Sequence, residues 1–502
     1  MFQLNARYFN VYFFAGLFSL LLSAIVAGRT DVINPDAICY LESAALMKQD
    51  FYAGVQLCGQ AKWPFYSMCV AGFSTLFRMS EVASAYVIDA LFSLITVMGF
   101  LKITALLSNK KRILMWAAVV ILLHHDFNAV KTYIVRDHGF WAFYVSSIVC
   151  LLYYAKTRQI GYALAWNVCL LLATLFRIEG GVYLLLVPLC VWCQTNDSFS
   201  QRAKSFFSLY VVTGIVAVTF FTWKLMHPSH ISVLSGRLPE LVDQLSQGLL
   251  LAKQKMHVTV SQLETVLGVY GAYNATLLLF VSVTLCYFSN IVSSLSLIYV
   301  VLLVYAWYRQ SLTASAKYRV VLWSYLIVGM AVTIVFFGEN LFLTNRYLMA
   351  ISLVAMCWIP FALESLMERR SKRLFVMALF LIGLTSIGGI VDCGYSKKYI
   401  DSAGAWVADH VPASSALYIK DIEVMYYSHR FGSGIFKAVE ETPSALSVTK
   451  DQWKQYQYIV LHIDKKSRIE NESVLQAIGL QPIQVFQNKR GDEVLIYDRR
   501  GA

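Results

Sequence analysis

Four short stretches of this 502-residue chain place acidic and basic residues beside long apolar runs. They read NPDAICYLES at 34–43, VRDHGF at 135–140, FRIEGG at 176–181 and TNRYLM at 344–349. Carboxylates such as those of Asp36 and Asp137 can position or deprotonate an acceptor. The guanidinium groups of Arg177 and Arg346 can bind phosphate with two hydrogen bonds and stabilise charge on a leaving group. These residue types suit transfer of a group from a phosphorylated donor.

The composition indicates the kind of domain that carries these residues. The chain is 58% hydrophobic and 14% charged, with a mean hydropathy of +0.57, whereas a soluble domain has roughly 25% charged residues. Apolar blocks recur to about residue 391, and the charge density then rises to soluble levels. We therefore predict a polytopic α-helical membrane domain at 1–391 and an extracytoplasmic α/β domain at 392–502. The formal charge of +12 comes from short basic clusters between apolar blocks, which indicates topology and not nucleic-acid binding.

Long apolar segments predict the membrane helices. The expected spans are 10–27, 83–107, 113–123, 139–155, 162–176, 181–193, 206–223, 275–308, 320–337, 347–363 and 374–391. Five basic loops, which begin near residues 109, 156, 201, 316 and 368, all fit the cytoplasmic side under the positive-inside rule. The four stretches that carry the candidate acidic and basic residues, and the tail, then face outward.

Two segments complicate the count, which we put at 11 spans within a range of 11 to 13. The segment 275–308 is long enough for two helices interrupted at Ser289 and Asn290, yet the loop charges permit an odd number of crossings. We favour one crossing plus a tilted or interfacial piece. The aromatic segment 62–77 would invert all later loops if it crossed the membrane, so we predict an amphipathic helix in the interface.

Each of the four stretches also has a simpler explanation. Asn34, Pro35 and Asp36 are typical of a helix start, with a cap, a proline at the first position and an acid in the first turn. Asp137 is a favourable acid at another helix start, and Arg346 is explained by snorkelling.

The third stretch, with Arg177 and Glu179, is explained by a tight loop with a partial ion pair. Together, however, the explanations place two acids and two arginines at helix ends on one membrane side, and a binding site accounts better for that combination. On the helix that starts at 35, Asp36 and Tyr40 share one face.

The remaining signals are weaker. Cys39 and Cys58 lie in the first polar segment and can pair if that side is oxidising, but their spacing does not decide it. The tail predicts a helix near 399–412, strands near 415–421 and 457–464, a helix near 473–479, and a hairpin at 481–499 that turns at 489–491. No catalytic constellation is visible in the tail, so we assign it to acceptor recognition or structure.

The order of these motifs resembles the GT-C superfamily of integral membrane glycosyltransferases, which includes protein mannosyltransferases and the lipid A aminoarabinose transferase. PDAICYLESA matches a first-loop D-E-x-x-Y pattern at Asp36 and Tyr40. KWPFY matches K-P-P-L-Y except that Trp63 replaces a proline. RDHG keeps the acid of T-D-x-P, and FRIEG matches T-R-P-E-G. The resemblance covers about 10–188.

The resemblance implies a polyprenyl-phosphate sugar donor and transfer on the outer face to a lipid, glycan or protein. On this resemblance we assign Asp36 as the acceptor-side base or positioning carboxylate, with Asp137 as its partner. The expected substrate-binding residues are Tyr40, Lys62, Arg177, Glu179, Arg346 and Tyr347, with the two arginines as phosphate ligands. No cofactor is certain. A divalent metal is possible, and the histidines at 124–126 or 227–230 are the candidate ligands.

Two alternatives stay open at this point. An oligosaccharide ligase or transferase that uses a lipid-linked glycan shares the donor chemistry. A secondary transporter would bury charges at mid-span and show two related halves. We expect a multi-pass protein of a bacterial inner membrane with its site and tail in the periplasm, or alternatively of the endoplasmic reticulum.

Overall fold

The computed structural model describes residues 8–194, 197–226, 238–369, 371–391 and 394–500. The chain divides into two compact units. The first contains Met1–Ala27, Val87–Thr132 and Arg136–Val391, and the second contains Gly28–Tyr86, Tyr133–Val135 and Asp392–Ala502. The first outward segment and the tail therefore belong to the same unit.

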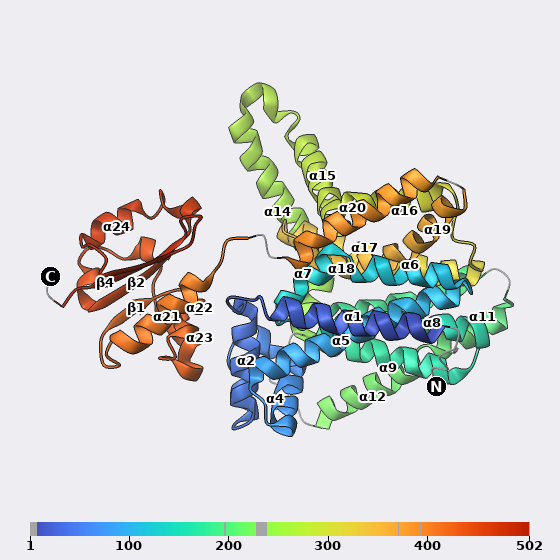
Figure 1. Cartoon of the computed structure of the whole chain (residues 1–502), viewed down its shortest axis with the longest axis horizontal. Coiled ribbons are helices and arrows are strands. Elements are labelled where there is room, and N and C mark those ends of the chain that lie inside the picture. Colours follow the sequence, from blue (N-terminus) through green and yellow to red (C-terminus); the bar gives the residue numbers. More distant parts are fainter. Residues whose placement is uncertain (1–7, 195–196, 227–237, 370, 392–393, 501–502) are drawn as a thin grey trace. The chain divides into compact units, whose positions relative to one another are not determined.

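The first unit is a bundle of apolar helices (Figure 1). Its helices are α1 (Phe9–Ala27), α5 (Glu81–Leu107, whose first turn belongs to the second unit), α6 (Lys111–Leu122), α7 (His125–Ala129), α8 (Asp137–Thr157), α9 (Ile160–Phe176), α10 (Glu179–Leu186), α11 (Phe199–Ser208), α12 (Val211–Met226), α14 (Leu238–Ala272), α15 (Ala275–Leu295), α16 (Leu297–Tyr308), α17 (Ala316–Asn340), α18 (Asn345–Ala355), α19 (Ile359–Glu368) and α20 (Lys372–Ile390), with the 3-10 turns η3 (Val130–Thr132), η4 (Val187–Cys193) and η6 (Met356–Trp358). Each expected span coincides with one or more of these helices.

Seven helical segments are long and apolar enough to cross a membrane, and the bent pair formed by α6 with α7 and η3 makes eight. The expected 11 to 13 spans are more than this count. The difference lies in the expected spans 162–176, 181–193 and 206–223, which the structure forms as the shorter helices Ile160–Phe176, Glu179–Cys193 and Val211–Met226. These are below the length of about 20 residues that a perpendicular crossing needs. The chain is a multi-pass membrane protein.

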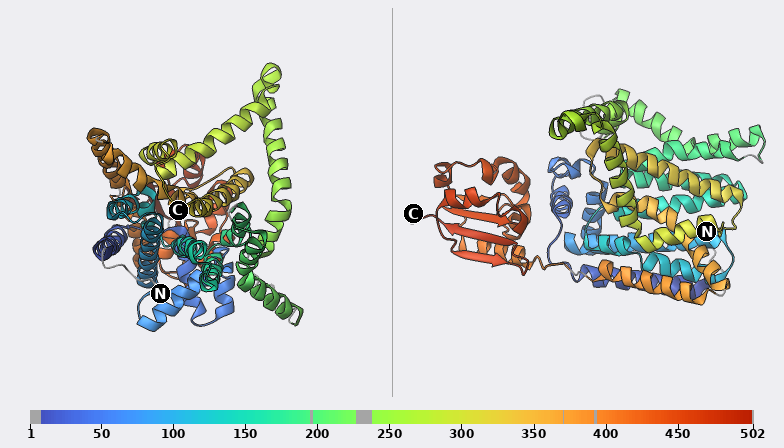
Figure 2. Two further views of the ribbon diagram at one scale, coloured as in Figure 1. Left: turned by 90° about the vertical axis from the view of Figure 1, so that its right-hand side faces the viewer. Right: turned by 90° about the horizontal axis from the view of Figure 1, so that it is seen from above.

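The predicted interruption at Ser289 and Asn290 is wrong, because both residues lie inside α15. The helix breaks instead at Ser296, where φ is 66° and ψ is 150°. One long helix and one short helix follow each other there, as expected. The long helices run alongside one another in the right-hand view of Figure 2, and α14 and α15 form a hairpin that projects from the bundle (Figure 1).

The tail of the second unit is a small α/β domain. Its elements are α21 (Lys398–His410), β1 (Leu417–Ile419), α22 (Ile422–Tyr427), η7 (Gly432–Gly434), α23 (Ile435–Glu441), η8 (Ala445–Ser447), η9 (Gln452–Gln455), β2 (Tyr458–Ile463), η10 (Lys465–Ser467), α24 (Glu472–Ile478), β3 (Gln484–Gln487) and β4 (Glu493–Asp498). The strand order is β1-β2-β4-β3, with β1 parallel to β2 and the other pairs antiparallel. The predicted helices, strands and hairpin are confirmed.

The core of the tail forms where the sheet buries its aromatic and aliphatic side chains. Trp453, Tyr418 and Ile459 are fully buried there, and the Tyr418 and Trp453 rings meet edge to face at 4.8 Å. The hairpin turns at Gly491, whose φ of 95° favours glycine.

The first outward segment of the second unit consists of α2 (Pro35–Met47), α3 (Phe51–Gln56), η2 (Gln60–Lys62) and α4 (Phe65–Phe77). It is joined to the tail by a hydrogen bond from the Ile33 amide to the Tyr427 hydroxyl, at 3.0 Å. Asn34 precedes α2, but its side chain does not cap the helix. Its carboxamide oxygen accepts instead from the Ile134 amide, at 3.0 Å, so the predicted capping bond is wrong.

Candidate functional site

The predicted site residues of the first unit lie at neighbouring helix ends. Asp137 begins α8, Arg177 follows α9, and Glu179 begins α10. Arg346 and Tyr347 occupy the first turn of α18. Residues from α8, α10, α17 and α18 line one pocket together with Arg177. The structure therefore brings these five of the predicted residues together.

Arg177 is the centre of an ion-pair network. Its guanidinium donates to the carboxylates of both Asp137 and Glu179, and its Nε donates to Glu179 Oε2 at 3.2 Å. The side chains of Arg177 and Asp137 are only 8% and 5% exposed, so each needs the other to compensate a buried charge. The partial ion pair expected in the third stretch is present, and Asp137 is an additional partner that the sequence did not indicate.

Two glycines allow the helix ends to approach this closely. A Cβ atom at Gly180 would lie 2.6 Å from the Thr174 amide nitrogen, and one at Gly139 would lie 2.4 Å from the Phe176 ring. Neither distance is possible for a real side chain without movement of the neighbour. Gly180 of FRIEGG and Gly139 of RDHG therefore allow the close approach that joins Asp137 to Arg177.

The pocket has a volume of about 350 Å³ and two kinds of wall. Its charged residues are Arg136, Arg177, Arg346, Glu179 and Glu339. Its apolar residues include Val182 and Leu186 of α10, Val332, Val335 and Phe336 of α17, and Leu343. We call it the arginine pocket. Such a pocket suits an amphipathic ligand with an anionic head and a hydrocarbon part.

Arginine side chains flank the ring of Tyr347. The guanidinium carbon of Arg177 lies 4.4 Å from the ring centroid, and that of Arg346 lies 5.5 Å from it. The ring also meets Phe336 at 4.9 Å. Stacking on an aromatic ring orients a guanidinium group and leaves its edge to donate hydrogen bonds.

Two charged residues of the pocket were not among the sequence predictions. Arg136 directly precedes Asp137, lines the pocket, and interacts electrostatically with Glu179. Since Arg177 is compensated by two carboxylates, Arg136 is a further cation that can meet an anionic ligand. Its position beside a helix start was visible in RDHG. Glu339, at the end of α17, carried no such signal.

The other predicted residues lie in the second unit. Asp36 is partly exposed in the first turn of α2 and accepts a hydrogen bond from Gln60. Tyr40 is 3% exposed, and its ring packs edge to face on Tyr66 at 5.1 Å. Lys62 is exposed at the end of η2.

No group of three or more His, Cys, Asp or Glu side chains in the described residues could hold a metal ion. His124 accepts from the Phe127 amide, and His125 pairs with Asp126 at 2.7 Å. The second candidate, at 227–230, lies outside the described residues.

The tail holds a partly buried polar network at the ends of β1 and β2. His462 Nδ1 lies 2.6 Å from Asp421 Oδ2, and His462 Nε2 lies 2.8 Å from the Tyr399 hydroxyl. Burial of the imidazole opposes its charge, but the hydrogen bond and charge of Asp421 outweigh it, so the pKa of His462 is raised. Burial likewise acts to raise the pKa of Asp421, yet the bond to His462 lowers it overall.

Comparison with known proteins identifies the fold. The chain resembles the archaeal oligosaccharyltransferase AglB from Archaeoglobus fulgidus, solved in complex with an inhibitory peptide and a dolichol-phosphate, with a TM-score of 0.55 and 13% sequence identity over 99% of this chain and 74% of that one. No family model matches the sequence, and no curated protein matches it significantly. The chain thus has a GT-C-like fold, with a helical membrane part and a small mixed sheet domain.

Proposed function

We propose that this protein is a membrane glycosyltransferase that transfers a sugar from a polyprenyl-phosphate donor to a lipid, glycan or protein acceptor on the outer face of the membrane. The observation that carries the proposal is the arginine pocket. Its cations lie at helix ends and its apolar wall follows α10 and α17, which matches a phosphate attached to a hydrocarbon chain. The dolichol-phosphate in the AglB complex supports a ligand of this class.

In the proposed reaction the acceptor attacks the anomeric carbon of the sugar. The bond from that carbon to the phosphate oxygen breaks, and polyprenyl phosphate leaves with the electron pair. Arg136 and Arg346 stabilise the charge that develops on the phosphate. Arg177 is held between Asp137 and Glu179 and completes the cationic wall. The carboxylate of Asp36 takes the proton of the acceptor.

A second candidate is transfer of a whole lipid-linked glycan, which the similarity to an oligosaccharyltransferase favours. The two candidates differ in the donor and can share the pocket. A secondary transporter gains no support from the comparison, because the protein of similar fold is an oligosaccharyltransferase.

The experiment that tests the proposal measures binding of undecaprenyl phosphate to the full-length protein in nanodiscs by native mass spectrometry. Arg346→Gln should weaken binding at least tenfold, because a charge-assisted bond contributes about 1.5–3 kcal/mol. Arg309→Gln is the matched control, since Arg309 also lies at a helix end beside a tyrosine, Tyr308, at 5.4 Å. Equal affinity of both variants and the wild type would contradict the proposal.

A further inference from the structure

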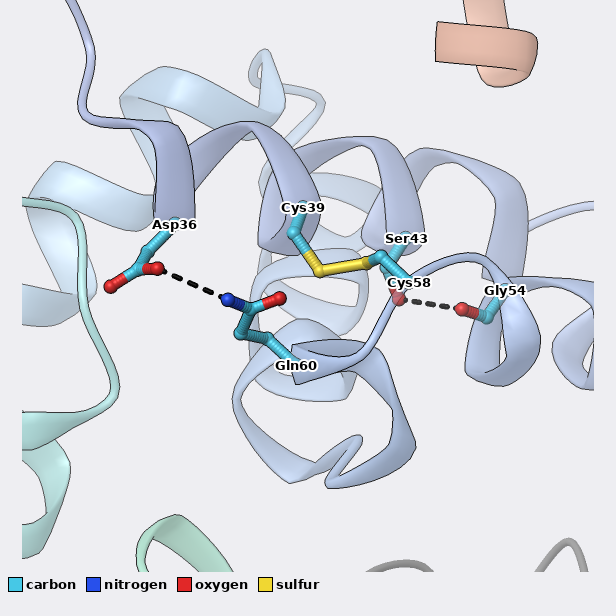
Figure 3. The surroundings of a disulfide bond; sticks show 6 residues. All are labelled: Asp36, Cys39, Ser43, Gly54, Cys58 and Gln60. Atoms are coloured by element: carbon cyan, nitrogen blue, oxygen red, sulfur yellow. Dashed lines mark hydrogen bonds between the residues drawn. A yellow bond between two sulfur atoms is a disulfide. The ribbon is translucent and has the colours of Figure 1, made fainter. Parts of the chain in front are cut away.

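The segment that follows α2 folds back along that helix and touches it at three points (Figure 3). Gln60 Nε2 donates to Asp36 Oδ1 at 3.2 Å. Cys58 forms a disulfide with Cys39. The Ser43 hydroxyl donates to the backbone oxygen of Gly54 at 2.9 Å. The unresolved pairing of Cys39 with Cys58 is thereby decided.

The spacing of these contacts follows from helix geometry. Residues 36, 39 and 43 are three and four positions apart, so they lie on one face of α2. Their partners at 60, 58 and 54 come in the opposite order along the chain. The returning segment therefore runs antiparallel to α2 and is attached at each turn of the helix. Gln60 lies at the end of the returning segment, opposite the first turn of α2.

Further contacts restrict the returning segment before it reaches Gln60. The Asp50 carboxylate caps α3 by accepting from the amides of Tyr52 and Ala53 at 2.9 and 3.1 Å. A Cβ atom at Gly54 would lie 2.9 Å from the Ser43 backbone oxygen, so α3 packs directly on α2. A disulfide then fixes the chain two residues before Gln60. The carboxamide of Gln60 is thus attached to a rigid support and does not extend from a free loop.

A carboxylate that accepts a proton needs a defined orientation. The bond from Gln60 restricts rotation of the Asp36 carboxylate. Misplacement of a reacting group by about 1 Å can cost on the order of 10²-fold in rate.

We propose that Gln60 is a positioning residue for Asp36 and that the Cys39–Cys58 disulfide keeps Gln60 in place. Reduction of this disulfide should lower the rate of transfer without weakening donor binding. This inference rests on the proposed function, in which Asp36 acts on the acceptor. Reduction by dithiothreitol breaks the S–S bond, and the two electrons and two protons from the reagent leave two cysteine thiols.

The first test compares two glutamines of the returning segment. Gln60→Leu removes the hydrogen bond and Gln60→Glu places a like charge beside Asp36, while Gln56 is exposed at the end of α3 and serves as the control with the same substitutions. The assay measures release of undecaprenyl phosphate from undecaprenyl-phosphate hexoses (glucose, mannose or galactose) in membranes that contain the acceptor.

Both Gln60 variants should lose about 10- to 100-fold in kcat with unchanged KM for the donor. The acid limb of the Gln60→Glu rate profile should move upward by about one pH unit or more, because a like charge disfavours ionisation of Asp36. A purely structural role would not produce this movement. An unchanged kcat and an unchanged pH profile in both Gln60 variants would overturn the proposal.

The second test concerns the disulfide. The variant Cys39→Ala/Cys58→Ala should lose kcat to a similar extent, and adding Gln60→Leu should cause little further loss, because both changes act through the same contact. Cys193→Ala, at an exposed free cysteine, is the control. If the double variant does not fold, folded wild-type protein is reduced with dithiothreitol and its thiols are counted. Fully reduced protein with unchanged kcat, or losses that multiply independently, would contradict the proposal.

The failure of this inference is distinguishable from failure of the proposed function. Full activity of Asp36→Asn would remove the proposed role of Asp36 itself. An inactive Asp36→Asn combined with wild-type behaviour of all Gln60 and cysteine variants would reject the positioning device alone.

Discussion

The guanidinium group of Arg177 donates to the carboxylate of Asp137, which begins the helix α8 packed beside the helix that Arg177 follows. Both side chains are buried. Asp137 therefore orients Arg177 and compensates its charge, whereas the sequence suggested that Asp137 is the partner of a second acid. In the GT-C-like fold of this chain, this ion pair connects the start of α8 to the end of α9 beside the arginine pocket.

Asp137→Asn should lower the melting temperature of the detergent-solubilised protein and weaken binding of undecaprenyl phosphate. Breaking a buried ion pair costs about 3–5 kcal/mol, and the loss should be smaller here because Glu179 stays with Arg177. Arg177→Gln is the matching change on the other side of the pair. In the double variant the two losses should be less than additive, and strictly additive losses would show that the pair is not coupled.

Gly180→Ala should destabilise the protein by about 1–3 kcal/mol, the usual cost of inserting atoms into a packed site, and should reduce binding of undecaprenyl phosphate. The reason is that its Cβ would lie 2.6 Å from the Thr174 backbone nitrogen. Gly181→Ala is the control, since its Cβ would make an ordinary contact at 3.5 Å with the Thr174 methyl group. Thermal unfolding and ligand binding of the two variants are compared. Equal effects at both glycines would argue against a close approach at Gly180.

Asp36→Asn should abolish most of the transfer reaction while the protein keeps its stability. Asparagine retains an oxygen that can accept from Gln60, whereas loss of a general base costs on the order of 10² to 10⁴ in rate. Asp31 is not a suitable control, because its carboxylate accepts from Ser396 at 2.6 Å and from the Lys397 amide at 3.2 Å. Asp50→Asn is preferred, since asparagine caps helices as well as aspartate does.

The measurement is release of undecaprenyl phosphate, together with a melting curve for each variant. Wild-type activity of Asp36→Asn would assign Asp36 to the helix start alone.

The stability of the folded tail should depend on pH through the pair formed by His462 and Asp421. Because the pKa of His462 is raised in the folded state, its contribution is complete below the ordinary histidine pKa of about 6.5 and is lost as the pH rises through the folded value. The lowered pKa of Asp421 gives a contribution that is present above about pH 3.9 and is lost in stronger acid. Asp464 and Glu423 also face His462 and favour its charge.

Hydrogen exchange of β2 peptides in the full-length protein, corrected for intrinsic rates, should therefore show less protection at pH 8 than at pH 6. His462→Gln should remove this difference, whereas the control His410→Gln, at an exposed position, should retain it. The same pH dependence in His462→Gln would exclude the pair as its cause.

The topology predicts opposite labelling of two engineered cysteines. With the exposed Cys193 and Cys286 replaced by serine, Ser414→Cys should react with an impermeant maleimide added outside intact cells, and Ser371→Cys should react only after lysis. The basis is that the basic loops mark the cytoplasmic side. Reversed labelling would place the tail in the cytoplasm.

Local patterns in the sequence determined the parts of this protein that depend on near neighbours. Apolar segments specified the helices, and short apolar runs bounded by turn residues specified β2 and the final hairpin. The two-residue separation of Arg177 and Glu179 indicated their ion pair. These features follow from hydrophobic periodicity and short-range charge, which the chain carries at each position.

Tertiary structure decided the contacts between residues far apart in the chain. The bond from Gln60 to Asp36, the pairing of Asp137 with Arg177, and the presence of Glu339 in the pocket depend on which helix faces meet. For Asp137 and Arg177 the helix ends can approach because a Cβ at Gly139 would meet Phe176 and a Cβ at Gly180 would meet Thr174. The sequence contains these glycines, but only the packed structure shows which atoms occupy the space that they leave.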